Sequence, residues 1–446
     1  MTMFKYDKSI LKQALEPLAI CIIGFCLQFT LSVLLAKILS TAQFGLMNYT
    51  IFISTLLASL IAAGTNANSK RFISTYLGHN DFKDLIEYIT WNIQFVKKTV
   101  SISLICFTIT FFLVDPFELY FSHNLTDTTK ILTVLFFAAP MYAISSILNS
   151  YLLCDKKIKL STYFSYIQIH TFMIALILLG LYTHIVSDRL DFILGVFLLV
   201  SILHASICFI TIKLTSPHIY QCFHPNKTIK LPHSKTSLWN KTALLQLMGN
   251  FGSIIMLKID YFILIFFMSS HSELGIYGVA INTAIFLTLI PLGIFQHIIP
   301  EVSALIETKS KTSLFQTKWN QCLILNNLIL LTVTMIMLFF TKTIILTFFG
   351  HQYLTAAPIL RILAATYTLT SISGLNHILL AFTGNAQYCS ISYCVRIILC
   401  VILAFCFQDY GLIGIAYASF ISELIRNIYV IVMIKKKVHL KPLGII

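Results

Sequence analysis

Long apolar stretches alternate with short polar segments along the whole chain. Each stretch holds about 20 mostly apolar residues, the length that an α-helix needs to cross the hydrocarbon core of a bilayer. The 446-residue sequence contains twelve of them. The predicted spans are 16–37, 44–65, 92–114, 129–153, 161–183, 190–213, 242–268, 274–299, 321–347, 356–382, 388–407 and 411–434. This pattern predicts an all-α polytopic membrane protein.

The composition supports this fold class. Hydrophobic residues make up 57% of the chain and charged residues only 11%, whereas a soluble domain carries about 25% charged residues. The first apolar stretch follows Lys5, Lys8 and Lys12. It is too long for the apolar core of a cleaved signal peptide, so we expect it to be a transmembrane helix.

The distribution of basic residues predicts the orientation. With the N-terminus in the cytoplasm, 23 of the 31 Lys and Arg residues fall in inner segments and four in outer ones. This bias follows the positive-inside rule and places both termini in the cytoplasm. The net charge of +14 is then explained by topology and by attraction to anionic lipids, and nucleic-acid binding is not expected.

One long polar connection divides the predicted spans into six plus six. Residues 214–240 contain three prolines among several lysines, a composition that favours an extended, solvated linker. We therefore predict an N-terminal six-helix lobe (1–213), a cytoplasmic linker (214–240), and a C-terminal six-helix lobe with a basic cytoplasmic tail (241–446).

A short internal repeat supports this division. Phe44-Gly45-Leu46 opens the second span, and Leu274-Gly275-Ile276-Tyr277 opens the eighth. Because each half has an even number of spans, the halves share one orientation, as in parallel repeats.

Motifs for covalent chemistry are missing from the sequence. It has no Walker-type phosphate loop, no GxSxG motif and no metal-binding spacing among its 13 histidines and 11 cysteines. No pair of carboxylates lies in an extramembrane domain. We therefore expect no cofactor, no bound metal and no enzymatic activity.

Ionisable residues inside the spans are the candidate functional residues. Each costs roughly 3 kcal/mol or more at the bilayer centre, so each indicates function unless it is paired structurally. Arg361 lies close to the outer surface, where its side chain can reach the interface. The complete set is Glu16, Lys258, Asp260, Arg361, Arg396, Glu423 and Arg426.

The last two spans form a hairpin that turns near Asp409. Arg396 precedes that turn by 13 residues and Glu423 follows it by 14, so both reach a similar depth. Arg426 shares a helix face with Glu423. We predict one buried cluster. If Glu423 pairs with one arginine, about one positive charge stays available for an anionic ligand; purely structural pairing is the alternative.

Three further basic residues complete the predicted site. Lys258 and Asp260 are two residues apart and cannot face each other, so Lys258 is predicted to face the space between the lobes or a carboxylate of another helix. Lys70 and Arg71 follow the second span, where they either line a cytoplasmic mouth or anchor the helix. The predicted substrate-binding residues are Lys258, Arg396, Arg426, Lys70 and Arg71, and the predicted structural or coupling residues are Glu16, Asp260 and Glu423.

Several segments resemble signatures of one transporter family. Asp260-Tyr261-Phe262-Ile263-Leu264, Leu274-Gly275-Ile276-Tyr277 and Pro300-Glu301-Val302-Ser303 resemble a pattern of bacterial lipid-linked oligosaccharide flippases. These are the O-antigen-type exporters of the multidrug/oligosaccharidyl-lipid/polysaccharide (MOP) superfamily. Leu35-Ala36-Lys37-Ile38-Leu39 and Gly411-Leu412-Ile413-Gly414 resemble further signatures of the family, with Lys37 in place of the usual arginine.

The resemblance implies a V-shaped MATE/MOP-like transporter fold of two six-helix lobes around a central, often cationic cavity. It implies a flippase that moves undecaprenyl-diphosphate-linked oligosaccharide from the cytoplasmic to the periplasmic leaflet of the bacterial inner membrane. Alternating access would drive this step in surface polysaccharide, O-antigen or lipopolysaccharide biosynthesis. The implied partners are that lipid, membrane lipids and polysaccharide polymerase or assembly proteins. The membrane potential would favour export of a diphosphate by roughly 2.3 kcal/mol per charge per 100 mV.

Two other functions stay open. A cation-coupled multidrug exporter of the same superfamily would carry an excess of carboxylates in its spans, whereas this chain has four basic and three acidic residues there. A membrane-embedded glycan polymerase or ligase would resemble chains with a large charged periplasmic loop, and no predicted outer loop is long enough.

Overall fold

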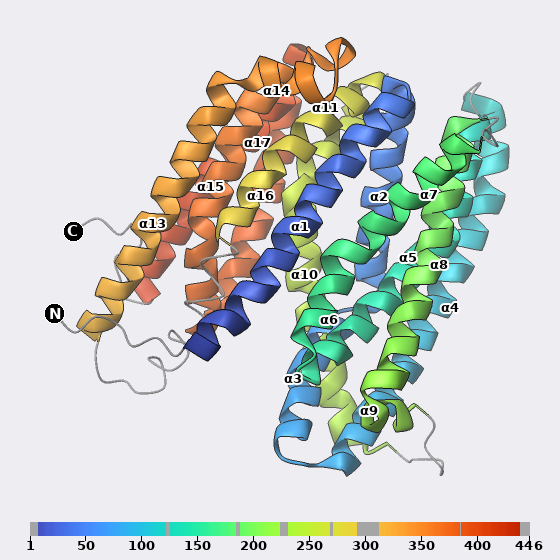
Figure 1. Cartoon of the computed structure of the whole chain (residues 1–446), viewed down its shortest axis with the longest axis vertical. Helices are drawn as coiled ribbons and strands as arrows, with labels where there is room; N and C mark the ends of the chain where they lie inside the picture. Colours follow the sequence, from blue (N-terminus) through green and yellow to red (C-terminus); the bar gives the residue numbers. More distant parts are fainter. Residues whose placement is uncertain are drawn as a thin grey trace. The chain divides into compact units, whose positions relative to one another are not determined.

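The computed structural model consists of helices joined by short turns (Figure 1). It describes residues 8–121, 125–183, 188–223, 231–267, 271–291, 312–383 and 385–437, and no strand occurs among them. The α-helices are α1 (Lys8–Ile38), α2 (Thr41–Ala62), α3 (Thr65–Gly78), α4 (Phe82–Phe121), α5 (Leu125–Cys154), α6 (Ile158–Tyr163), α7 (Ile169–Tyr182), α8 (Arg189–Thr215), α9 (Pro217–Gln221), α10 (His233–Phe267), α11 (His271–Ala284), α13 (Thr312–Phe339), α14 (Thr341–Phe348), α15 (Ala356–Phe382), α16 (Ala386–Cys406) and α17 (Gly411–Lys437).

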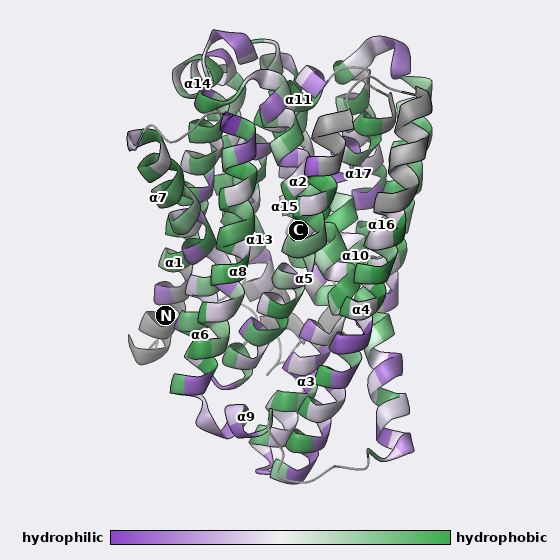
Figure 2. Ribbon diagram, turned by 90° about the vertical axis from the view of Figure 1, so that its right-hand side faces the viewer, coloured by the Kyte–Doolittle hydropathy of each residue, from purple (hydrophilic) through white to green (hydrophobic). Residues whose placement is uncertain are grey.

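The predicted transmembrane spans are helical where the structure describes them, but 321–347 is not a single helix, because it is interrupted at Phe340 between α13 and α14. Within the described ranges, 11 helical segments are long and apolar enough to cross a membrane. α15 matches the remaining predicted span, 356–382. The span 274–299 is helical through Pro291, and its remainder lies outside the described residues. Figure 2 shows hydrophobic residues along the middle of most helices and hydrophilic residues gathered toward their ends. The chain is therefore an all-α, multi-pass membrane protein.

The helices form two compact units. Met1–Leu46 and Gly252–Ile446 make up unit 1, and Met47–Phe251 make up unit 2. In unit 1, α15 packs against α11, α13 and α17, and α17 packs along α16. In unit 2, α5 is the central helix and contacts α3, α4 and α8. The division into two lobes at the connection 214–240 remains a prediction.

The expected extended conformation of residues 214–240 is wrong at both ends. α9 covers Pro217–Gln221, and α10 already begins at His233. The reason is a buried anchor: Trp239 is fully buried, with its ring 5.4 Å from the Tyr88 ring and 5.5 Å from the Trp91 ring. Burial of these large rings stabilises the first turns of α10, although the prolines and lysines of this segment favour an extended chain.

Close helix crossing explains the repeated Phe-Gly and Leu-Gly segments. A Cβ atom on Gly275 of α11 would lie 2.0 Å from the carbonyl oxygen of Thr41, and one on Gly45 of α2 would lie 2.5 Å from that of His271. Tyr261 donates a hydrogen bond from its hydroxyl to the Gly45 carbonyl at 3.0 Å. The two glycines let the starts of α2 and α11 touch backbone to backbone, as small residues do between membrane helices.

Replacing Gly275 by Ala is expected to destabilise unit 1 by about 1–3 kcal/mol, because the new methyl group must push the two backbones apart. The thermal unfolding midpoint of the protein purified in detergent measures this effect. The matched control is Gly195→Ala in α8, where nothing lies within 4 Å of the added Cβ and helix propensity favours alanine. Equal midpoints for the two variants would contradict the close crossing.

Candidate functional site

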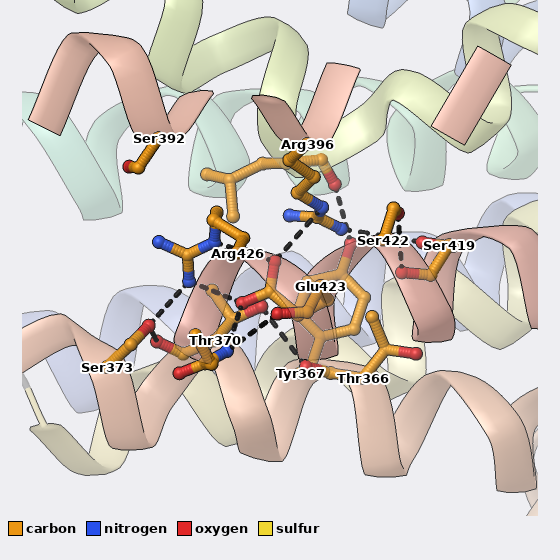
Figure 3. A network of polar contacts seen from close by, with 12 residues as sticks. Thr366, Tyr367, Thr370, Ser373, Ser392, Arg396, Ser419, Ser422, Glu423 and Arg426 are labelled. Atoms are coloured by element: carbon orange, nitrogen blue, oxygen red, sulfur yellow. Dashed lines mark hydrogen bonds and ion pairs between the residues drawn. The ribbon is translucent and has the colours of Figure 1, made fainter. Parts of the chain in front are cut away.

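The buried charges gather where α16 and α17 pack together. Arg396 belongs to α16, Glu423 and Arg426 to α17, and none of the three is more than 2% exposed. Figure 3 shows their charged groups pointing toward one another. The predicted buried cluster is confirmed, because the hairpin turn at Gln408–Tyr410 brings the two helices back to the same depth.

Both carboxylate oxygens of Glu423 are engaged. Oε2 lies 3.0 Å from Nε of Arg396 and accepts a hydrogen bond from Nε of Arg426 at 2.9 Å. Oε1 accepts from Nη2 of Arg426 and, at 3.0 Å, from Nδ2 of Asn427. The contact with Arg396 is an ion pair only, since Nε and Nη1 of Arg396 have no hydrogen-bond partner. One carboxylate therefore holds two guanidinium groups.

This geometry corrects the expectation that Glu423 pairs with one arginine and leaves the other charge free. Glu423 contacts both arginines, and the carboxylate of Asp260 on α10 also acts electrostatically on Arg396. Two carboxylates thus act on the two guanidinium groups, and Asp260 acts on the Lys258 ammonium group as well. Nearby opposite charges of this kind make buried ions tolerable in a medium of low dielectric constant.

Asp260 is tied to the neighbouring helix. It is 1% exposed, and its Oδ2 accepts a hydrogen bond from the Tyr277 hydroxyl of α11 at 3.0 Å, while its Oδ1 accepts from the Tyr261 backbone amide at 3.0 Å. These contacts join α10, α11 and the arginine cluster within unit 1. Asp260 and Tyr277, which belong to the segments that resemble the flippase family, thus form a hydrogen bond between α10 and α11.

Lys258 lies at a break in α10. Its φ of −135° and ψ of 25° are not helical, and its side chain is half-buried. The Tyr367 hydroxyl of α15 donates to the carbonyl of the preceding residue, Leu257, at 2.9 Å. A break inside a membrane helix is tolerated where a neighbouring side chain pairs with the freed backbone group. Lys258 and Asp260 share α10, and the carboxylate of Asp260 acts electrostatically on the Lys258 ammonium group.

The sequence reasoning did not include His377 of α15 in the cluster. Nη1 of Arg426 contacts Nε2 of His377, and the imidazole ring stacks on Tyr393 with ring centroids 5.3 Å apart. A guanidinium group has only donors, so Nε2 accepts and the imidazole is neutral, with its proton on Nδ1. Ser373, also on α15, accepts from Nη2 of Arg426. The arginine thus joins α15 to α17.

The other predicted site residues lie elsewhere. Lys70 and Arg71 are exposed on α3 in unit 2, beyond the end of α2 at Ala62, and the guanidinium of Arg71 lies 5.4 Å from the centre of the Phe72 ring. Glu16 is half-buried on α1. Over the described ranges, no group of three or more His, Cys, Asp and Glu side chains could hold a metal ion. Pro300 and the residues after it in the family-like segment lie outside the described residues.

The comparisons with known proteins agree with this architecture. Residues 10–306, more than half of the chain, match the sequence model of the family described as polysaccharide biosynthesis protein. Among solved structures, the lipid II flippase MurJ in an inward closed conformation matches with a TM-score of 0.68 at 16% identity, covering 94% of this chain and 87% of that one.

Transporters of the MATE family are similar as well. A multidrug resistance MATE transporter of the MOP superfamily matches in its inward-facing conformation with a TM-score of 0.67 at 15% identity, covering 95% of this chain and 98% of that one. An outward-facing one matches with a TM-score of 0.64 at 13% identity, covering 97% and 96%. No curated protein sequence matches significantly. The chain belongs to the polysaccharide biosynthesis protein family, and its multi-pass helical fold is similar to those of the lipid II flippase and the MATE transporters.

Proposed function

We propose that the chain is a flippase for lipid-linked oligosaccharide. It moves undecaprenyl-diphosphate-linked oligosaccharide from the cytoplasmic to the periplasmic leaflet of the bacterial inner membrane by alternating access. The product serves surface polysaccharide or O-antigen assembly, together with polymerase or other assembly proteins.

The observation that carries this proposal is the family match over residues 10–306. The fold adds to it, because it is similar to that of a known flippase. A protein of polysaccharide biosynthesis that is built as a transporter needs a polysaccharide precursor as cargo. The lipid II flippase has the same fold and, by its name, moves a lipid-linked precursor. An amphiphile of this kind keeps its tail in the bilayer while the polar head crosses.

The buried and exposed cations divide into two proposed roles. Lys258 is half-buried at a helix break, a position that suits contact with a mobile diphosphate, and the exposed Lys70 and Arg71 suit the first capture of an anionic head group. Arg396 and Arg426 are fully buried and paired. We therefore propose that they act with Glu423 and Asp260 to join α15, α16 and α17. Glu16 is assigned a structural or coupling role on α1.

A cation-coupled multidrug exporter is the second candidate, because the similarity to a MATE transporter, with a TM-score of 0.67, is nearly as high as that to the flippase. The cations around Glu423 leave no surplus of carboxylates for a cationic drug. A glycan polymerase or ligase receives no support from the family or the fold.

The test is complementation of a strain that lacks its own oligosaccharide flippase and makes the matching lipid-linked glycan. We expect the chain to restore surface polysaccharide, measured by gel staining and by antibody binding to intact cells, with protein abundance checked in parallel. Efflux of cationic dyes is measured in the same cells. Dye efflux without any surface polysaccharide, at normal abundance and with several glycans tried, would favour the drug exporter instead.

A further inference from the structure

Unit 2 contains an apolar cleft of about 550 Å³ that is bounded by α4, α5 and α8. Its walls include Val96 and Lys97 of α4, Ile144 and Leu148 of α5, and Ala205 and Phe209 of α8. All three helices run next to one another in this unit, with α5 in contact with both α4 and α8 (Figure 1). The volume lies within the range of pockets that hold small organic ligands.

The cleft lies near one end of these helices. Its α8 residues, 205–210, precede the end of the helix at Thr215 by 5–10 residues, which is about 8–15 Å along the axis. Its α5 residues, 144–151, likewise lie shortly before the helix end at Cys154. The charge distribution places this end in the cytoplasm, so the cleft belongs to the inner half of the bilayer.

Hydrogen bonds hold the wall of the cleft in place. Nδ2 of Asn92 on α4 donates to the Tyr151 hydroxyl of α5 at 2.8 Å and to the Ser69 hydroxyl of α3 at 3.0 Å. Asn92 and Tyr151 are at most 1% exposed. The cleft is therefore pre-formed, and little conformational entropy of these wall side chains is lost when a ligand binds.

The lining selects the chemistry of the occupant. At this depth an open apolar cleft is filled by hydrocarbon, because exposing it to water is unfavourable. Lys97 lines the cleft and is exposed. Further exposed lysines lie at 156, 157 and 213, close to the same ends of α5 and α8. Asp155 is ion-paired with His218 at 3.0 Å, and Asp84 and Glu87 of α4 are ion-paired with Lys235. The occupant therefore has a hydrocarbon chain and an anionic head group.

We propose that this cleft binds the hydrocarbon chain of a polyprenyl phosphate lipid from the inner leaflet, with the phosphate near Lys97. The assignment rests on the proposed function, which supplies a lipid of this chemistry on the cytoplasmic side. Diacyl phospholipids of the bilayer share the anionic head group. They carry two chains in place of one, so phosphatidylglycerol serves as the competitor that distinguishes the two kinds of lipid.

Binding of undecaprenyl phosphate to the full-length protein in detergent tests the proposal, with native mass spectrometry as the measurement. Lys97→Glu is expected to weaken binding about tenfold, since it reverses one charge beside the phosphate. Ala205→Trp fills the cleft from α8 and is expected to abolish binding. The matched controls are Lys83→Glu, at an exposed position of α4 that lies 14 residues from Lys97, and Ile202→Trp of α8, which is outside the cleft lining. Both should leave binding within about twofold. Monodisperse elution confirms that each variant folds.

Three outcomes overturn the cleft assignment: unchanged binding in both cleft variants, equal losses in the controls, or equal binding and full displacement by phosphatidylglycerol, which would indicate an ordinary anionic lipid site. Undecaprenol, which lacks the phosphate, should bind weakly and should not respond to Lys97→Glu. The complementation assay tests the proposed function separately. If the chain binds undecaprenyl phosphate in the cleft but supports no export, only the flippase function fails; if it exports but the cleft variants bind normally, only the cleft assignment fails.

Discussion

Replacing Glu423 by Gln is expected to destabilise unit 1 by about 3–5 kcal/mol, because the change leaves two buried guanidinium groups without their shared carboxylate. Glu423 is fully buried, and its two oxygens contact Arg396 and Arg426. The remaining anion beside Arg396, Asp260, cannot balance both cations. The thermal unfolding midpoint in detergent and the fraction of monodisperse protein measure the loss.

Arg426→Gln should cost less, about 1–3 kcal/mol, since Glu423 keeps its ion pair with Arg396 while hydrogen bonds to Ser373 and His377 are lost. The double variant Glu423→Gln/Arg426→Gln removes one buried charge of each sign, so its destabilisation should be smaller than the sum of the two single effects. Strict additivity would mean that the two side chains act independently and would contradict the shared-carboxylate geometry.

An exposed ion pair provides the control. Lys130 and Asp191 lie 2.8 Å apart, with their side chains 39% and 45% exposed. Asp191→Asn removes a carboxylate from this pair and is expected to cost no more than about 1 kcal/mol, because solvent screens the charges. A loss as large as that of Glu423→Gln would show that the assay responds to any charge change in this protein.

The transmembrane helices could be predicted because bilayer thickness imposes a length and an apolar composition on each of them. Their ends were less predictable. The predicted third span begins at residue 92, but α4 already begins at Phe82, where Asp81 accepts a hydrogen bond from the Asp84 amide. Asn80 adopts φ of 55° in the turn before this helix. Hydropathy does not distinguish a cap from a turn residue.

The arginine cluster could be predicted in part, because a hairpin fixes the relative depth of its two helices. The contacts from α15 could not, since no spacing in the sequence relates His377 or Ser373 to Arg426. The break at Lys258 was also missed, because it contains neither proline nor glycine. The backbone carbonyl of Leu257 at this break accepts a hydrogen bond from the Tyr367 hydroxyl, and Tyr367 lies 110 residues from Leu257 in the sequence. No local sequence pattern therefore indicates the break.

Lys258→Ala is expected to reduce polysaccharide export to background in the complementation assay while the protein reaches normal abundance. The proposed reason is that a diphosphate crossing the membrane needs a cation that it can reach, and a partly exposed side chain meets this need better than a fully buried one. Lys258 is half-buried at the break in α10, whereas Arg396 and Arg426 are at most 2% exposed. Lys258→Arg should retain part of the activity, because charge matters more than shape for a mobile phosphate group.

Two comparisons separate this role from a structural one. Lys241→Ala removes an exposed lysine from the same helix and should leave export unchanged, which controls for the general loss of positive charge from α10. Lys258→Met retains the length and most of the apolar stem of lysine without its charge, so a purely packing role would leave Lys258→Met active, and a phosphate-binding role would not. Full export by Lys258→Ala at normal abundance would remove Lys258 from the substrate path, and the exposed pair Lys70 and Arg71 would then be the cations to replace next.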